Sequence, residues 1–292
     1  MFSEEWPLMM FTLLCQLAVG SYIILLFIRN SLEKSDRDRA AQLTDPGLKI
    51  VGPVMAAALL LSVFHLGTPL GAYRSILNLE TSWLSREIIT AGGFFAFWCL
   101  SILSIRQGKM PAWLGIVTSV FGLAAVFSMA SIYATSVRPV WTDTNTYLAF
   151  YGATFATGCV FAACSVAVAA KGQAIPEQAG SILKTVACVA AIAVLVPLAY
   201  TPILVSSLKA GSTAANASAA LISDTFAMPL VIRAVLSLAG VWLLYAAVKN
   251  QIASLTVSRA AIALFLVLAG EFIGRYVFYA TAVSIFTGNS LI

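Results

Sequence analysis

The strongest constraint on this chain is a series of apolar segments, each long enough to cross a lipid bilayer as a helix. One crossing of the roughly 30 Å hydrocarbon core takes about 20 residues. Eight such runs occur along the 292 residues, at approximately 8–28, 48–66, 87–105, 113–135, 147–170, 185–206, 227–248 and 260–282. They are too long for barrel strands and do not alternate between polar and apolar residues. We therefore predict an all-α membrane protein with eight transmembrane helices.

The small number of charged residues supports the same class. They make up 10% of the chain, whereas soluble domains carry about 25%. We expect one integral membrane domain over residues 1–292. The polar segment "KGQAIPEQAGSILK" lies between the fifth and sixth runs, and eight runs are compatible with two four-helix halves. A nucleic-acid-binding role is excluded, because it would need a basic, aromatic-laced soluble face.

The positions of lysine and arginine predict the orientation, because cytoplasmic loops carry an excess of these residues. Eleven of them lie in the loops after the first, third, fifth and seventh predicted helices. Four lie in the connections on the other side, Arg74, Arg86, Arg138 and Lys209. The first side is predicted to be cytoplasmic, so both termini should lie outside. The start, "MFSEEWPLMM", has no basic residue, so we expect an uncleaved first helix rather than a signal peptide.

Three polar segments are predicted to be loops. Residues 30–47, "NSLEKSDRDRAAQLTDPG", carry the most charge and end in the helix-breaking sequence Asp-Pro-Gly. Residues 67–86 and 207–226 are the longest outer connections. The cysteines all fall within predicted spans and form no CxxC motif or Cys/His cluster, so neither a disulfide framework nor a metal site is indicated: Cys15, Cys99, Cys159, Cys164 and Cys188.

A candidate site lies where the second run ends and the third begins. His65 closes the second run in "FHLGTPLGAYRSI", and Glu87 opens the third in "WLSREIITAGG". Sequential helices are antiparallel, so both residues should lie near the outer surface, with Arg74, Trp83 and Arg86 between them. Quinol oxidation releases two electrons and two protons, and an imidazole and a carboxylate can accept those protons. Simpler interpretations are an interfacial histidine, a helix cap at Glu87 and an interfacial belt tryptophan.

The histidine count limits the cofactors. Bis-histidine ligation of haem b needs two imidazoles per haem, and the chain has one histidine. Electrons from a quinol would therefore pass directly to the redox centre of a partner.

A second polar group lies inside the last run, in "LAGEFIGRYVFYA". Glu271 and Arg275 are four residues apart, so they share a helix face and are predicted to form an ion pair within the membrane. Unpaired charge costs at least about 2.5–3.5 kcal/mol there, so the pair should face protein. The pair could be structural, or it could belong to the quinol pocket or a proton exit. Arg233 could reach the lipid interface or join this group.

Four segments resemble the anchor subunit of the dimethyl sulfoxide reductase family, the DmsC type: "EEWPLMMFTLLCQLAVG", "HLGTPLGAYRSI", "WLSREI" and "LAGEFIGRYVFYA". The resemblance covers most of the chain. It implies a haem-free, eight-helix protein of the bacterial inner membrane that holds a molybdopterin catalytic subunit and an iron–sulfur subunit at the outer face. It also implies menaquinol as the bound substrate, with His65 and Glu87 at the quinol site. The helix end "SIYATSVRPVWTDTNT" is similar as well, so Tyr133 and Trp141 are further candidates.

Two other functions stay open at this point. The intramembrane charges Arg233, Glu271 and Arg275 would suit a transporter, although no internal repeat supports one. A scaffold that anchors its partners without binding quinol is the other alternative.

Overall fold

The computed structural model describes residues 2–65, 78–170, 177–249 and 256–286. Eight of its helices are long and apolar enough to cross a membrane. They are α1 (Phe2–Leu32), α2 (Arg37–His65), α3 (Trp83–Arg106), α4 (Ala112–Ala134), α5 (Asn145–Ala169), α6 (Glu177–Lys209), α8 (Ala227–Lys249) and α9 (Val257–Ala280). Each coincides with one predicted run, so the all-α architecture with eight candidate spans is confirmed.

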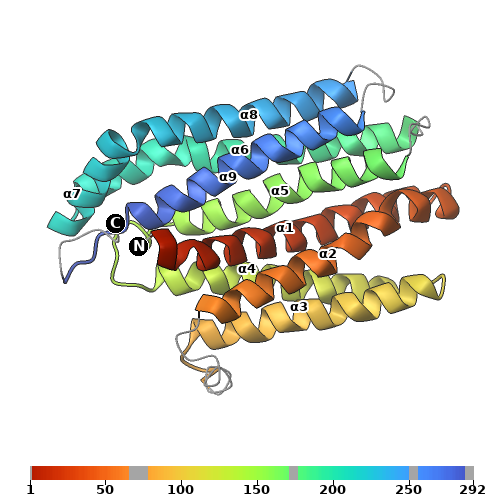
Figure 1. The fold of residues 1–292 in the computed structure, drawn as a ribbon, viewed down its shortest axis with the longest axis horizontal. Coiled ribbons are helices and arrows are strands. Elements are labelled where there is room, and N and C mark those ends of the chain that lie inside the picture. The colour runs from red at the N-terminus through yellow and green to blue at the C-terminus, as the bar shows by residue number, and fades with distance from the viewer. Residues whose placement is uncertain (1, 66–77, 171–176, 250–255, 287–292) are drawn as a thin grey trace.

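The helices lie side by side in one bundle, with α1 and α5 at its centre (Figure 1). In their most apolar stretches, 83% and 78% of the residues are buried, against 28–50% in the other six helices. Helices α2, α3 and α4 lie on one side of this central pair, and α6, α8 and α9 lie on the other. Helices α1 and α5 pack against each other between these two groups of helices. The division into two four-helix halves stays a prediction.

The start of α1 and the end of α9 lie at the same end of the bundle, which we call the terminal end (Figure 1). The end of α2 and the start of α3 lie there too. The side of the membrane that this end faces is a prediction from the basic residues alone.

Two glycines bring the backbones of the central helices into direct contact. A Cβ atom added to Gly20 in α1 would lie 1.9 Å from the carbonyl oxygen of Thr154 in α5. A Cβ atom added to Gly158 would lie 2.3 Å from the carbonyl carbon of Gly20. Small residues at helix crossings allow this approach in membranes, where packing rather than hydrophobic burial drives helix association.

The predicted loop at 30–47 is wrong, because helix occupies most of it. Helix α1 continues to Leu32 and α2 begins at Arg37, so Pro46 lies inside α2. The fold compensates for the unfavourable proline locally. The Arg29 guanidinium forms ion pairs with Asp45 and with Glu33, the latter at 2.8 Å. Tertiary contacts thus override the Asp-Pro-Gly signal.

Arg29 should therefore stabilise the joined ends of α1 and α2. It is buried, whereas the carboxylates of Glu33 and Asp45 are partly exposed. We expect Arg29→Gln to lower the free energy of unfolding by about 1–3 kcal/mol, less than the cost of breaking a fully buried pair. Thermal unfolding of the purified chain measures the change. The exposed Lys184→Gln serves as a control and should leave the midpoint unchanged, and equal midpoints for both variants would contradict the assignment.

The connection at 207–226, which is predicted to lie on the outer side, also contains helix. A short helix, α7 (Thr213–Ala220), is followed by a π-helical turn, η2 (Leu221–Thr225). The hydroxyl oxygen of Ser212 accepts a hydrogen bond from the Ala215 amide and caps α7. The Ser218 hydroxyl oxygen accepts a bond from the Val283 amide, so α7 is tied to the segment that follows α9.

Candidate functional site

The site predicted from the sequence lies at the terminal end, where α2 stops at His65 and α3 starts at Trp83 (Figure 1). The Ser82 hydroxyl oxygen caps α3 by accepting a hydrogen bond from the Ser85 amide. Glu87 follows about one helical turn later. The helix ends that carry the two proposed proton acceptors thus meet at one end of the bundle, while Arg74 and the side chain of His65 lie outside the described residues.

The Glu87 side chain points into the bundle and does not cap its helix. The residue is only 5% exposed. Its carboxyl group interacts electrostatically with Cys15 of α1, Tyr133 of α4 and Tyr279 of α9. Among the described residues, no hydrogen bond or ion pair to this carboxyl group is present. A buried carboxyl group without a partner is costly, which makes Glu87 a candidate for binding a ligand that donates a hydrogen bond.

Trp83 and Arg86 interact mainly with each other and with the preceding loop. The guanidinium carbon of Arg86 lies 4.2 Å from the centre of the Trp83 ring. Arg86 also donates hydrogen bonds to the carbonyl oxygens of Leu79 and Glu80, at 2.9 and 2.8 Å. Trp83 packs edge-on against Phe127 of α4. These contacts position the start of α3. Direct contact of either side chain with a quinol is a proposal.

Two buried tyrosines lie behind Glu87. Their hydroxyl oxygens, from Tyr133 and Tyr279, are 2.6 Å apart. Trp141 packs against both rings and donates its indole N–H to the Phe278 carbonyl oxygen at 2.8 Å. Tyr133 and Trp141 are candidates from the sequence, whereas Tyr279 was not predicted. A signal for it existed, because Tyr279 follows Arg275 by four residues and therefore shares its helix face.

The predicted ion pair between Glu271 and Arg275 is not among the ion pairs of the described residues, although the two side chains interact electrostatically. Glu271 pairs instead with Arg233 of α8, whose Nη2 lies 3.4 Å from the carboxylate. Gly274 leaves room for this arrangement, because a Cβ atom there would lie 2.4 Å from Nε of Arg233. Arg275 donates a hydrogen bond to the Gln16 side-chain oxygen at 2.7 Å and lies over the Phe150 ring. Membership of one helix face thus did not determine the partners, since each residue pairs with another helix.

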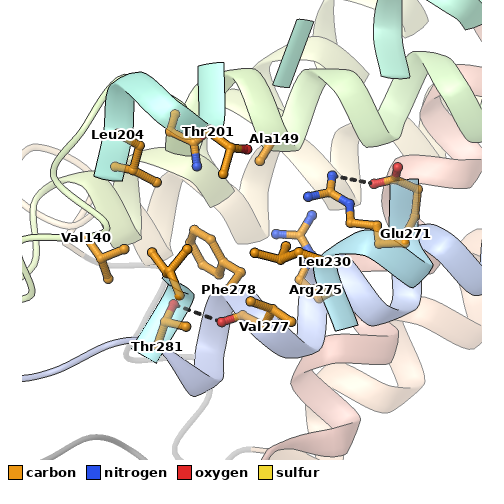
Figure 2. Close-up of a pocket in the computed structure, with 14 residues that line it drawn as sticks. Val140, Ala149, Thr201, Leu204, Leu230, Glu271, Arg275, Val277, Phe278 and Thr281 are labelled. Atoms are coloured by element: carbon orange, nitrogen blue, oxygen red, sulfur yellow. Dashed lines mark hydrogen bonds and ion pairs between the residues drawn. The ribbon is translucent and has the colours of Figure 1, made fainter. Parts of the chain in front are cut away.

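A cavity of about 60 Å³ lies beside these charges, between α5, α6, η2, α8 and α9. Figure 2 shows Glu271, Arg275 and Phe278 on one part of its wall, with Thr201 and Leu204 of α6 on another. Arg233 and Asn145 also line it. The cavity is large enough for a few water molecules.

A conventional metal centre has no support in the described part of the chain. No group of three histidine, cysteine, aspartate or glutamate side chains there could hold a metal ion. The five cysteines are free, and they lie in α1, α3, α5 and α6.

The sequence matches one family model across most of its length. The model describes the DMSO reductase anchor subunit, DmsC, and it matches residues 2–281. The YnfH subunit of an anaerobic dimethyl sulfoxide reductase of Escherichia coli K12 is 33% identical over 283 residues, which cover 94% of each protein. The C subunit of the same organism's anaerobic dimethyl sulfoxide reductase is 28% identical over a match of the same coverage. The corresponding C subunit of Haemophilus influenzae Rd is 30% identical over 155 residues, 50% of this protein and 53% of that relative.

Proposed function

Because this chain belongs to the DmsC family of DMSO reductase anchor subunits, we propose that it binds and oxidises menaquinol at the periplasmic face of the bacterial inner membrane. The electrons then pass to an iron–sulfur subunit, which supplies a molybdopterin catalytic subunit on the same face. The protein itself is a multi-pass anchor of a reductase complex rather than the subunit that reduces the terminal acceptor. Family membership favours this function over transport.

The observation that carries the proposal is the buried carboxyl group of Glu87, which has no hydrogen-bond or ion-pair partner among the described residues and lies at the end of the bundle where α2 stops at His65. A quinol is dissolved in the lipid bilayer, and its ring carries two hydroxyl groups. Glu87 accepts the proton from one hydroxyl, and His65 accepts the proton from the other. The burial that makes Glu87 costly without a ligand makes a hydrogen bond from a quinol hydroxyl favourable.

The Tyr133 and Tyr279 hydroxyl groups give this site a polar wall. Both interact electrostatically with Glu87 and are themselves buried. We propose that they orient the carboxylate, while Trp83 provides an apolar edge for the ring and Arg74 and Arg86 keep the rim electropositive. Since the chain has a single histidine, electrons leave the quinol without a bis-histidine haem of this subunit.

The proposal is tested by bound quinone and by a quinol analogue. We expect the purified complex to carry about one menaquinone per anchor subunit. Glu87→Gln should weaken binding of a hydroxyquinoline-type quinol analogue by roughly 10- to 100-fold, because the neutral amide oxygen accepts a weaker hydrogen bond than a carboxylate does. Fluorescence titration measures the affinity. Glu80→Gln, on the exposed turn before α3, is the matched control and should bind as wild type does.

The scaffold alternative predicts a different result. A scaffold would carry no stoichiometric quinone, and its analogue affinity would be the same in the Glu87→Gln and Glu80→Gln proteins. That pair of results would contradict the proposed function.

A further inference from the structure

The charged side chains that line the 60 Å³ cavity between α5, α6, η2, α8 and α9 do not add up to zero charge. Its wall includes two guanidinium groups, from Arg233 and Arg275, and one carboxylate, from Glu271. Both Glu271 and Arg275 are 5% exposed, and the Arg233 side chain is 12% exposed. Glu271 forms an ion pair with Arg233 and also interacts electrostatically with Arg275, so one carboxylate is shared by two guanidinium groups and the cluster carries one surplus positive charge. Placing an uncompensated charge within a membrane protein is costly, so a counter-charge is favoured there.

The neighbours of Arg275 offset this charge only in part. Its Nη2 donates to the neutral amide of Gln16, and its guanidinium lies 3.9 Å from the centre of the Phe150 ring. Neither contact supplies a negative charge. Within the described residues, Nη1 of Arg275 and Nε of Arg233 are buried and have no acceptor. Buried N–H donors without acceptors are rare and need an explanation.

The polar lining of the cavity also favours a ligand that accepts hydrogen bonds. The hydroxyl groups of Thr201 and Thr281 already donate to the carbonyl oxygens of Pro197 and Val277, one turn back. The remaining N–H donors on the wall therefore belong to the two arginines and to Asn145. At about 60 Å³ the space holds a small ion with water and is too small for an aromatic headgroup or a sugar.

A larger groove lies next to the cavity. A more open groove of about 490 Å³ runs between α6, η2 and α8 and shares Thr201, Ile222 and Leu230 with the cavity. Lys209, at the end of α6, lines this groove. Lysine at the groove and arginine within the cavity make this region electropositive, which raises the local concentration of anions.

We propose that the cavity between α5, α6, α8 and α9 binds a small monovalent inorganic anion of the halide class, held by Arg275 and Arg233. The bound anion neutralises the surplus charge and stabilises the packing of α8 against α9. This site is distinct from the proposed quinol site but adjoins it, because Tyr279 of α9 interacts electrostatically with both Arg275 and Glu87.

Bromide replacement tests the proposal on the full-length protein in detergent. The starting buffer contains sodium gluconate, whose anion is too large for the cavity, and sodium bromide replaces it at constant ionic strength. At a bromide concentration about a hundred times the dissociation constant, the midpoint of thermal unfolding should rise by roughly 5 °C and then saturate. A midpoint that does not respond to bromide would overturn the proposal.

Three variants give expected effects of different sign. Arg275→Gln removes the surplus charge and should abolish the bromide response. Glu271→Gln adds a second uncompensated charge, so it should lower the midpoint in gluconate and enlarge the bromide response at least twofold. Arg106→Gln, at the exposed end of α3, should respond as wild type does. A cavity that holds only water would show no such ordering, and that result would refute the site.

Anomalous scattering locates the ion directly and still decides the question if Arg275→Gln fails to fold. In crystals of the wild-type complex grown with bromide, we expect an anomalous peak within hydrogen-bond distance of the Arg275 guanidinium. Absence of a peak there, in crystals that diffract well enough to show the arginine side chains, would count against the proposal.

Discussion

A Glu87→Gln anchor subunit, assembled with its partner subunits, is expected to lose quinol-dependent turnover by about 100-fold or more while remaining folded and membrane-bound. The size of the loss follows from the typical 10²- to 10⁴-fold contribution of a positioned proton acceptor. The glutamine side chain keeps the shape of Glu87 but cannot take up the proton. His65→Ala should cause a loss in the same range, because the second hydroxyl group of the quinol would have no acceptor.

Two electron donors separate this effect from a defect in assembly. A quinol reduces the complex through the anchor, whereas a water-soluble reduced dye delivers electrons directly to the iron–sulfur partner. We expect the variants to fail with quinol and to reach wild-type rates with the dye. Equal loss with both donors would indicate misassembly, and wild-type rates with quinol would disprove the assignment of Glu87 and His65.

The second large effect concerns the crossing of α1 and α5. Gly20→Ala is expected to lower the free energy of unfolding by about 3 kcal/mol or more, because the added methyl group meets the backbone of Thr154 and no rotamer change can relieve the clash. The same substitution at Gly92 in α3 is the matched control, since nothing lies within 4 Å of a Cβ atom there.

Thermal unfolding and the yield of monodisperse protein measure this contrast. Gly92→Ala should match wild type or be slightly more stable, because alanine is favoured over glycine in helices by up to about 1 kcal/mol. If Gly20→Ala and Gly92→Ala unfold at the same temperature, the backbone contact between α1 and α5 does not exist as described.

The helix content was predictable because bilayer thickness sets a minimum length for every span. The helix ends were less so. Helix α6 has 33 residues, whereas its predicted run covers 185–206. Pro46 was predicted to end a helix, but an ion pair between Asp45 of α2 and Arg29 of α1 stabilises the helix around it. Such contacts between helices are invisible to a local pattern.

The site was predictable to the extent that it depends on chain direction. The end of α2 and the start of α3 were expected to lie at the same end of the bundle, because consecutive helices are antiparallel. The partners of the buried charges could not be inferred in this way. Arg275 bonds to Gln16, which is 259 positions away in the sequence, and Glu271 pairs with Arg233, which is 38 positions away. Periodicity identified the face of α9 correctly but contains no information on what lies opposite that face.

Helix α1 contacts both the region of Glu87 and the region of Arg275. Its neighbouring residues Cys15 and Gln16 face different ways, the first toward Glu87 and the second toward Arg275. The glycine contact with α5, little more than one turn further along, prevents α1 from sliding or rotating. The close packing of these helices would hold a bound quinol at a constant distance from the redox centre of a partner subunit. The rate of electron tunnelling would then depend on this fixed distance and not on a conformational change.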